Sequence, residues 1–290
     1  ARFIQDVSLP GMLYGRVLHP PSPGAVLQSI DIQTINALPG VVATVRDGSF
    51  LGVIADNEYL AVKALAKLAA LATWHETPTL PDMTAMPDFL RSQPAETTVF
   101  AEKEGADPAS GAREFAAAYS RPFLAHASIG PSCAVALYQP TSLQVWTHSQ
   151  GMYNLRADLA VMFDLPADKI ALQHVESAGC YGHNGADDAA ADAALLARAV
   201  PGRPVQLQWT REDELGSAPF GAAMAVDLKA TVDGNGRIAS WQHDVWSTGH
   251  SMRPGRNKTP LLLAASLLEK GFETQVAINM PSASGGGAER

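Results

Sequence analysis

Residues 170–199 read IALQHVESAGCYGHNGADDAAADAALLARA and carry the strongest structural signal in the chain. They begin as a short strand, pass through a glycine-containing turn at 176–188 and continue as an alanine-rich helix. Gly179, Gly182 and Gly185 permit positive φ and let a ligand approach the backbone closely. The free N–H groups at the start of the following helix suit an anionic group. This order of elements indicates an α/β arrangement with a candidate binding site at the turn.

The same turn admits three other interpretations. A tight strand-to-helix turn in which Asp187 and Asp188 cap the helix needs no ligand at all. Cys180 and His183 are a nucleophile and a base in the manner of a thiol hydrolase, although no third residue or oxyanion hole is evident. His183 with the two aspartates is a possible metal set, but it lacks a matching second cluster.

A second segment, Val145-Trp-Thr-His-Ser-Gln-Gly151, is a strand that runs into a polar turn and then into a helix over 152–163. The next strand ends near Val175, so the two strands and the helix form a predicted βαβ unit. Ligands in such sheets collect at the carboxyl ends of parallel strands. We therefore expect Gln150 and the 179–182 turn to lie close together in space.

The remaining chain divides into regions that differ in their residue patterns. A small α+β region to residue 80 includes a helix from Glu58 to about Trp74, capped by Asp56 or Asn57. Prolines interrupt residues 81–121, which we interpret as a connector with one or two helical turns at 112–118. A larger domain is expected over 122–290. Within it, strands on either side of Asp233-Gly-Asn-Gly236 are predicted to form a hairpin.

Composition limits the partners. The net charge is −8, and 47% of the residues are hydrophobic against 17% charged. Nucleic acids require clustered Lys and Arg, which the sequence lacks, so no nucleic-acid partner is expected. The two cysteines, Cys133 and Cys180, provide no disulfide framework and no cysteine zinc site. The composition does not determine the compartment.

Several segments in register resemble the molybdenum-binding large subunit of the xanthine dehydrogenase/aldehyde oxidase family, with the bacterial isoquinoline oxidoreductase and nicotinate dehydrogenase-like subunits the most similar. The resemblance covers nearly the whole chain. It is carried by Leu9-Pro-Gly-Met-Leu13 with Gly15-Arg16, Leu38-Pro-Gly-Val41, Gln150, Gly179-Cys-Tyr-Gly182 and Arg203-Pro-Val205.

The resemblance implies an α+β fold. A small domain like the family's a/b hammerhead occupies 1–80, a proline-rich connector 81–121, and part of a mixed α/β molybdenum-cofactor-binding domain 122–290. Gln150 would donate a hydrogen bond to an oxo ligand of molybdenum, and Gly179, Cys180, Tyr181 and Gly182 would complete the cofactor-binding set. The pterin dithiolene holds the metal, so no metal-ligating residues are expected.

The family pattern is not matched everywhere. Cys180 and Tyr181 stand where the family usually has Gly and Phe. Gly185 stands where xanthine-type members have an acidic residue, so purine specificity is not expected.

The implied activity is oxidation of an N-heterocycle or an aldehyde with water as the oxygen source. The implied cofactor is molybdenum-molybdopterin, in its cytosine dinucleotide form. The partners would be the remainder of the large subunit, an iron–sulfur subunit, an electron acceptor such as a cytochrome, and a small-molecule substrate. The family's catalytic base is expected beyond residue 290, so this fragment alone is expected to be inactive and free of cofactor. The alternative is a non-catalytic α+β module that binds an anion at the glycine-rich turn 179–185.

Overall fold

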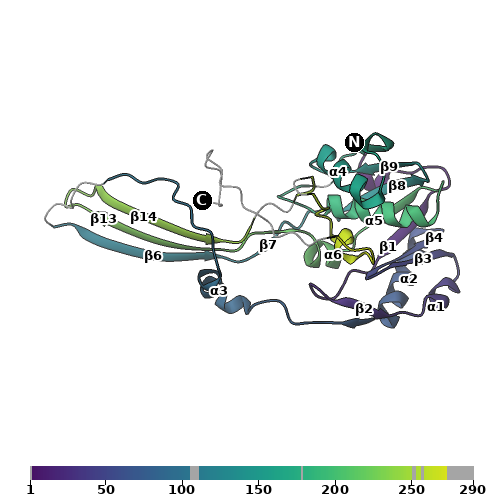
Figure 1. Cartoon of the computed structure of the whole chain (residues 1–290), viewed down its shortest axis with the longest axis horizontal. Coiled ribbons are helices and arrows are strands. Elements are labelled where there is room, and N and C mark those ends of the chain that lie inside the picture. The colour runs from purple at the N-terminus through teal and green to yellow at the C-terminus, as the bar shows by residue number, and fades with distance from the viewer. Residues whose placement is uncertain (1, 105–110, 178, 250–252, 256–257, 273–290) are drawn as a thin grey trace. The chain divides into compact units, whose positions relative to one another are not determined.

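The computed structural model describes residues 2–104, 111–177, 179–249, 253–255 and 258–272 (Figure 1). The chain forms two compact units, each built from separated stretches of sequence. Among the described residues, unit 1 takes those of 1–79, 125–219 and 252–276, and unit 2 takes those of 80–124 and 220–251. All of the candidate site residues belong to unit 1.

A seven-stranded sheet forms the centre of unit 1. Its strands β1, β9, β10 and β11 all run in one direction, because β9 pairs parallel with β10, β1 pairs parallel with β11, and β8 lies antiparallel between β9 and β11. Their carboxyl ends therefore share one edge of the sheet. In spatial order the strands are β10 (Ile170–His174), β9 (Ser142–Thr147), β8 (Cys133–Gln139), β11 (Val205–Gln208), β1 (Leu13–Val17), β4 (Phe50–Ala55) and β3 (Val41–Asp47).

Helices cover both faces of this sheet (Figure 1). Strand β4 shows the two layers, because Phe50 and Ile54 pack in one core cluster while Leu51 and Val53 pack in another. The first cluster lies under α4 (Met152–Phe163) and α5 (Ala186–Ala199), and the second lies under α1 (Ile32–Asn36) and α2 (Glu58–Leu71).

The start of α2 agrees with the prediction. Asn57 is its N-cap, and the side chain accepts a hydrogen bond from the backbone N–H of Leu60. The helix ends at Leu71 and not near Trp74, because residues 73–75 form strand β5 (Thr73–His75), which pairs with β2 (Val26–Ser29).

Unit 2 is built on a three-stranded antiparallel sheet in the order β14 (Ile238–Ser247), β13 (Met224–Val232) and β6 (Arg113–Arg121), with helix α3 (Met86–Ser92). The predicted hairpin is confirmed, and Asp233 Oδ1 accepts the backbone N–H groups of Asn235 and Arg237 in its turn. The expected helical turns at 112–118 are wrong. Residues 113–118 belong to β6, whose pairing with β13 along its whole length overrides their helix propensity.

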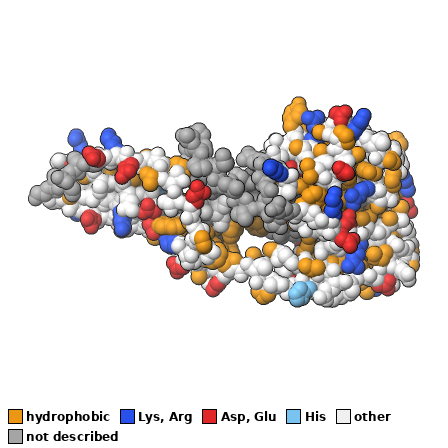
Figure 2. Space-filling model, viewed as in Figure 1, with side chains coloured by type: hydrophobic (Ala, Val, Ile, Leu, Met, Phe, Trp, Pro, Cys, Tyr) orange, Lys and Arg blue, Asp and Glu red, His pale blue; other side chains and the backbone are white. Residues whose placement is uncertain are grey.

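The other short elements are η1 (Ile4–Asp6), η2 (Met83–Ala85), β7 (Leu124–Ala125), η3 (Ala167–Lys169), α6 (Arg211–Gly216), β12 (Phe220–Gly221) and α7 (Leu263–Leu267). Among the described residues, no helix combines the length and the apolar character that a membrane crossing requires. On the face drawn in Figure 2, basic and acidic side chains are interspersed over the described surface and do not gather by sign.

Candidate functional site

The candidate site lies where β9 and β10 end. These strands pair parallel in the register Thr147↔His174, and the backbone N–H of Val175 donates to the Thr147 carbonyl. Gln150 follows β9 and precedes α4, while the 179–182 loop follows β10 and precedes α5. The βαβ prediction is therefore confirmed, and both turns open on the same edge of the sheet.

The turn after β9 is held by local hydrogen bonds. Thr147 Oγ1 accepts the backbone N–H of Ser149, and Ser149 Oγ accepts that of Gly151. His148 is buried, which lowers its pKa to about 4. The ring is thus neutral near pH 7, and its Nε2 accepts the backbone N–H of Cys133 at 3.3 Å. These contacts fix the backbone on which the exposed side chain of Gln150 stands.

Gln150 reaches the loop after β10. Its Nε2 donates to Cys180 Sγ, and the Cys180 thiol donates to the Gly182 carbonyl at 3.3 Å. Tyr181 between them is 56% exposed. The structure therefore brings Gln150 and residues 179–182 together at an exposed edge, as the strand geometry predicts.

Gly182 allows this loop to approach its neighbour. Its φ is +152°, and a Cβ there would lie 2.2 Å from the His126 ring. His126 Nδ1 in turn contacts the His183 carbonyl at 2.8 Å. His126 therefore supports the loop, a role that its local sequence did not indicate.

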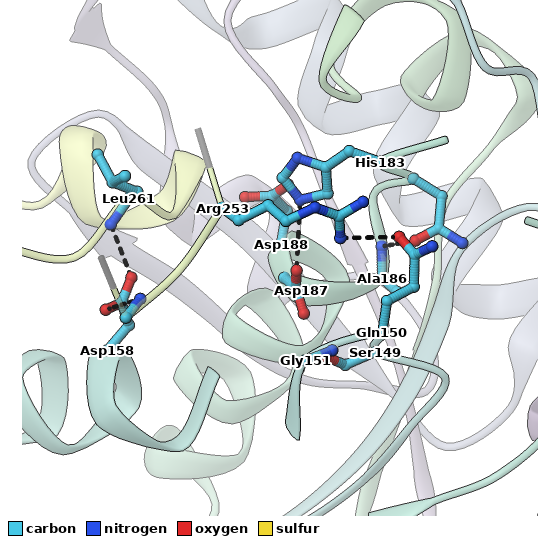
Figure 3. A network of polar contacts seen from close by, with 12 residues as sticks. Ser149, Gln150, Gly151, Asp158, His183, Ala186, Asp187, Asp188, Arg253 and Leu261 are labelled. Carbon is cyan, nitrogen blue, oxygen red and sulfur yellow. Dashed lines mark hydrogen bonds and ion pairs between the residues drawn. The ribbon is translucent and has the colours of Figure 1, made fainter. Parts of the chain in front are cut away.

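The acidic residues after the loop are not helix caps. Gly185 is the N-cap of α5, and the Asn184 side chain accepts the backbone N–H of Ala186. Asp187 and Asp188 lie in the first turn of the helix with their side chains buried, which the capping interpretation missed. Asp187 Oδ2 contacts His183 Nε2 at 3.3 Å, as Figure 3 shows.

Asp188 accepts the backbone N–H of Leu263 at 2.8 Å. Burial raises the pKa of Asp188 to about 8, and the nearby carboxylates of Asp187 and Asp192 act in the same direction. Asp188 is therefore mostly protonated near pH 7.

A buried polar cluster lies further along the same edge, after β1 and β11. His19 Nδ1 contacts Asp213 at 2.8 Å and His19 Nε2 contacts Asp192 at 3.2 Å, while Trp209 Nε1 donates to Asp192 at 2.9 Å. Burial alone would lower the pKa of His19, but the two carboxylates outweigh it and raise the pKa to about 10. Sequence reasoning did not find this cluster, because its members lie far apart along the chain.

Two of the interpretations left open by the sequence lose support. The contacts of Cys180 are an amide and a carbonyl, and His183 is engaged by Asp187, so the geometry does not assemble a thiol nucleophile with its base. Within the described part of the chain, no group of three or more His, Cys, Asp or Glu side chains is arranged to hold a metal ion. A cofactor that brings its own metal ligands is compatible with this edge.

Unsatisfied polar atoms flank the loop on both sides. Ser177 Oγ, Asn184 Nδ2 and Asp187 Oδ1 are buried without a hydrogen-bond partner among the described residues. Such groups are costly unless a ligand or water completes them. Together with the exposed side chain of Gln150, they fit a polar cofactor at this edge.

Comparison with known proteins identifies the family of the chain. Residues 94–269 match the family described as the molybdopterin cofactor-binding domain. The chain belongs to this family. Among curated relatives, the chain is 36% identical to a nicotinate dehydrogenase subunit of Pseudomonas putida over 250 residues. It is 25% identical to the beta chain of isoquinoline 1-oxidoreductase of Brevundimonas diminuta over 260 residues.

These matches cover 82% and 83% of the chain but only 21% and 32% of the two relatives. The chain therefore spans about a fifth to a third of their length.

Solved structures show the same fold. Quinoline 2-oxidoreductase from Pseudomonas putida 86 superposes with a TM-score of 0.65 at 20% identity, covering 84% of this chain and 37% of that one. Aldehyde oxidoreductase from Desulfovibrio gigas gives a TM-score of 0.66 at 17% identity, covering 84% and 32%. The mixed α/β fold of these two solved structures is therefore confirmed for this chain.

Proposed function

We propose that this chain is part of a molybdenum hydroxylase subunit that oxidises an N-heterocycle or an aldehyde with water as the oxygen source. The observation that carries the proposal is the meeting of the Gln150 amide with the 179–182 loop at the carboxyl edge of β9 and β10, in a member of the molybdopterin cofactor-binding family. The names of the relatives support the reaction class.

In this proposal Gln150, Gly179, Cys180, Tyr181 and Gly182 hold molybdenum-molybdopterin, in its cytosine dinucleotide form. The bound cofactor supplies the two-electron redox chemistry, and the protein supplies orientation and electrostatics. Gln150 offers an amide N–H donor on a backbone that buried contacts fix. Gly179 and Gly182, at φ +107° and +152°, let the main chain approach closely where a Cβ would intrude.

Other parts of the active enzyme are proposed to lie outside these residues. The catalytic base would come from the rest of the large subunit. Electrons would pass to an iron–sulfur subunit and then to an acceptor such as a cytochrome. The division into a hammerhead-like domain over 1–80, a connector over 81–121 and a cofactor-binding domain over 122–290 stays a prediction.

The alternative of a simple anion-binding module is disfavoured by charge. The first turn of α5 carries Asp187 in addition to the protonated Asp188, and an acidic side chain there opposes an anion at the helix N-terminus. Amide donors from Gln150 and the loop backbone are what the edge offers instead.

Elemental analysis for molybdenum tests the proposal. The longest form of the gene product that contains this chain should hold about one molybdenum per subunit and oxidise nicotinate, quinoline or an aldehyde with a dye acceptor. The 290-residue chain alone should do neither. Gln150→Leu should lower the molybdenum content, since it removes the donor, whereas Gln139→Leu at an exposed position should not. A longest form without molybdenum contradicts the proposal.

A further inference from the structure

Arg253 contacts the side-chain amide of Gln150. Arg253 Nη1 donates to Gln150 Oε1 at 3.0 Å, as Figure 3 shows. A guanidinium group has donors only, so the amide atom that it contacts has to be the carbonyl oxygen. The NH2 group of Gln150 must then face the other way, and it does so by donating to Cys180 Sγ.

We propose that Arg253 is a positioning residue that keeps the Nε2 donor of Gln150 directed at the 179–182 loop. This inference rests on the proposed function, which places the cofactor at that loop. An exposed glutamine amide without a hydrogen-bond partner rotates readily. A rotation of 180° exchanges the positions of its NH2 donor and its oxygen acceptor. Arg253 prevents that exchange, because a rotated amide would set its NH2 group against the guanidinium.

Two buried aspartates hold residues that follow Arg253 in the chain. Asp158 of α4 accepts the backbone N–H of Gly255 through Oδ1 and that of Leu261 through Oδ2, each at 2.8 Å. Asp188 of α5 accepts the N–H of Leu263 at 2.8 Å. Figure 3 shows Asp158 and Leu261 at one end of this network and Gln150 at the other. Two buried aspartates with no other assigned role thus attach Gly255, Leu261 and Leu263 to the helices that follow the two site turns.

Gly255 brings this segment close to α4. Its φ is +70°, and a Cβ at that position would lie 2.6 Å from the Asn154 backbone. Asn154 is four residues beyond Gln150 on the helix that the site turn enters. A side chain at 255 would push the segment away and move Arg253 from Gln150. Gly255→Ala is therefore a second way to break the contact without removing the guanidinium group.

Side-chain amide NMR on the 290-residue chain tests the contact without any cofactor. With 15N-labelled glutamine, the Gln150 signals are identified by their loss in Gln150→Leu. We expect Arg253→Ala and Gly255→Ala to move them toward the positions of exposed amides, with about tenfold faster exchange with water. Arg156→Ala is the matched control, because Arg156 lies over the Tyr153 ring in the same unit. Unchanged Gln150 signals in Arg253→Ala overturn the proposal.

Molybdenum retention in the longest form of the gene product tests the consequence. We expect Arg253→Ala to weaken retention about tenfold, as loss of a supporting hydrogen bond commonly does at metal sites. Because Arg253 acts through Gln150, Arg253→Ala should have no further effect in a Gln150→Leu background. A further loss there shows that Arg253 acts independently and overturns the inference. A wild-type protein without molybdenum counts against the proposed function, while the NMR result still decides the Arg253 contact.

Discussion

His19 shows how strongly single side chains at this edge depend on their partners. His19 is 8% exposed, and its ring lies between Asp192 and Asp213. A buried charge is stable only where opposite charges and hydrogen bonds replace water. Both imidazole nitrogens have a carboxylate partner, so the ring carries a positive charge at neutral pH. It links the end of β1 to helices α5 and α6.

We predict that this charge makes stability fall as the pH rises. The folded pKa of His19 is about 10 against 6.5 for the unfolded residue, so the folded chain keeps a proton that the unfolded chain loses. The contribution is complete below pH 6.5 and disappears as the pH rises toward 10. Urea unfolding between pH 8 and 9.5 should show a loss on the order of 1 kcal/mol per pH unit.

His19→Gln should remove most of that slope, because it removes the titrating group. His75→Gln, at an exposed position on β5, should leave the slope as it is. The range above pH 8 is chosen because the raised pKa of Asp188 produces a slope of its own below it. Equal slopes in wild type and His19→Gln would contradict the charged assignment.

The residues of the candidate site differ in how far sequence could find them. Gln150 and the 179–182 loop could be placed together because strand order and the βαβ rule act over short distances in the chain. Arg253 lies 103 residues beyond Gln150 and follows no recognisable element, so only the folded chain shows their contact. The local sequence of His126 is typical of a satisfied buried histidine, and its support of Gly182 depends on a backbone conformation that sequence does not reveal.

Helix α5 is the element on which the sheet core depends. All twelve of its residues from Ala186 to Ala197 are buried, and most are alanines, so the helix lies close to the strands. Leu196 fills the space left by two strand glycines. A Cβ at Gly15 would lie 2.4 Å from its Cδ1, and one at Gly52 would lie 2.7 Å from its Cδ2. Helix and strands are thus complementary in shape at this point.

We predict a compensating pair of substitutions here. Leu196→Ala should destabilise unit 1 by about 2–5 kcal/mol, since it leaves a cavity. Gly15→Ala should cost about 1–3 kcal/mol through overpacking. The double variant should cost less than the sum, because the new methyl group enters the vacated space. Urea unfolding measures all three, with Leu215→Ala at an exposed site as the control. Strict additivity would show that the two side chains do not share this space.

At the scale of elements, local sequence patterns were sufficient to predict structure where the contacting residues lie close together in the chain. The β13–β14 hairpin, the βαβ unit and the Asn57 cap each depend on residues a short distance apart. Strand β6 is missed from sequence because Phe115-Ala-Ala-Ala-Tyr119 favours a helix in isolation. Its partner β13 begins at Met224, and that long-range pairing decides its conformation.

At the scale of the whole molecule, unit 1 is built from stretches of sequence that are separated by residues of unit 2. The sheet takes β1, β3 and β4 from before residue 80 and β8 to β11 from after residue 122. The contact between β1 and β11 joins these groups of strands. The sequence indicated strands in both parts of the chain but not the pairing of β1 with β11, because neither of these strands carries a pattern that identifies its partner.

We predict that a single cut in residues 94–104 leaves the two fragments associated. These residues are exposed and contain no helix or strand. The first fragment keeps β1 and β4, which remain bonded to β11 and packed against α5. Limited proteolysis should give two bands under denaturing conditions and a single species on native gel filtration. Separation of the fragments without denaturant would contradict the shared sheet.

The pairing of β1 with β11 also limits when the sheet can be completed during synthesis. Gly11 and Arg203 beside it are 192 residues apart. At the usual pace of a ribosome, the first strand waits about 10 to 40 s before its neighbour is synthesised. During that time Leu13 and Val17 lack helix α5, which packs against them in the folded chain, so their apolar side chains stay exposed in the nascent chain. Arg253 is translated later still, so the side chain that orients the Gln150 amide is synthesised after Gln150 and the 179–182 loop.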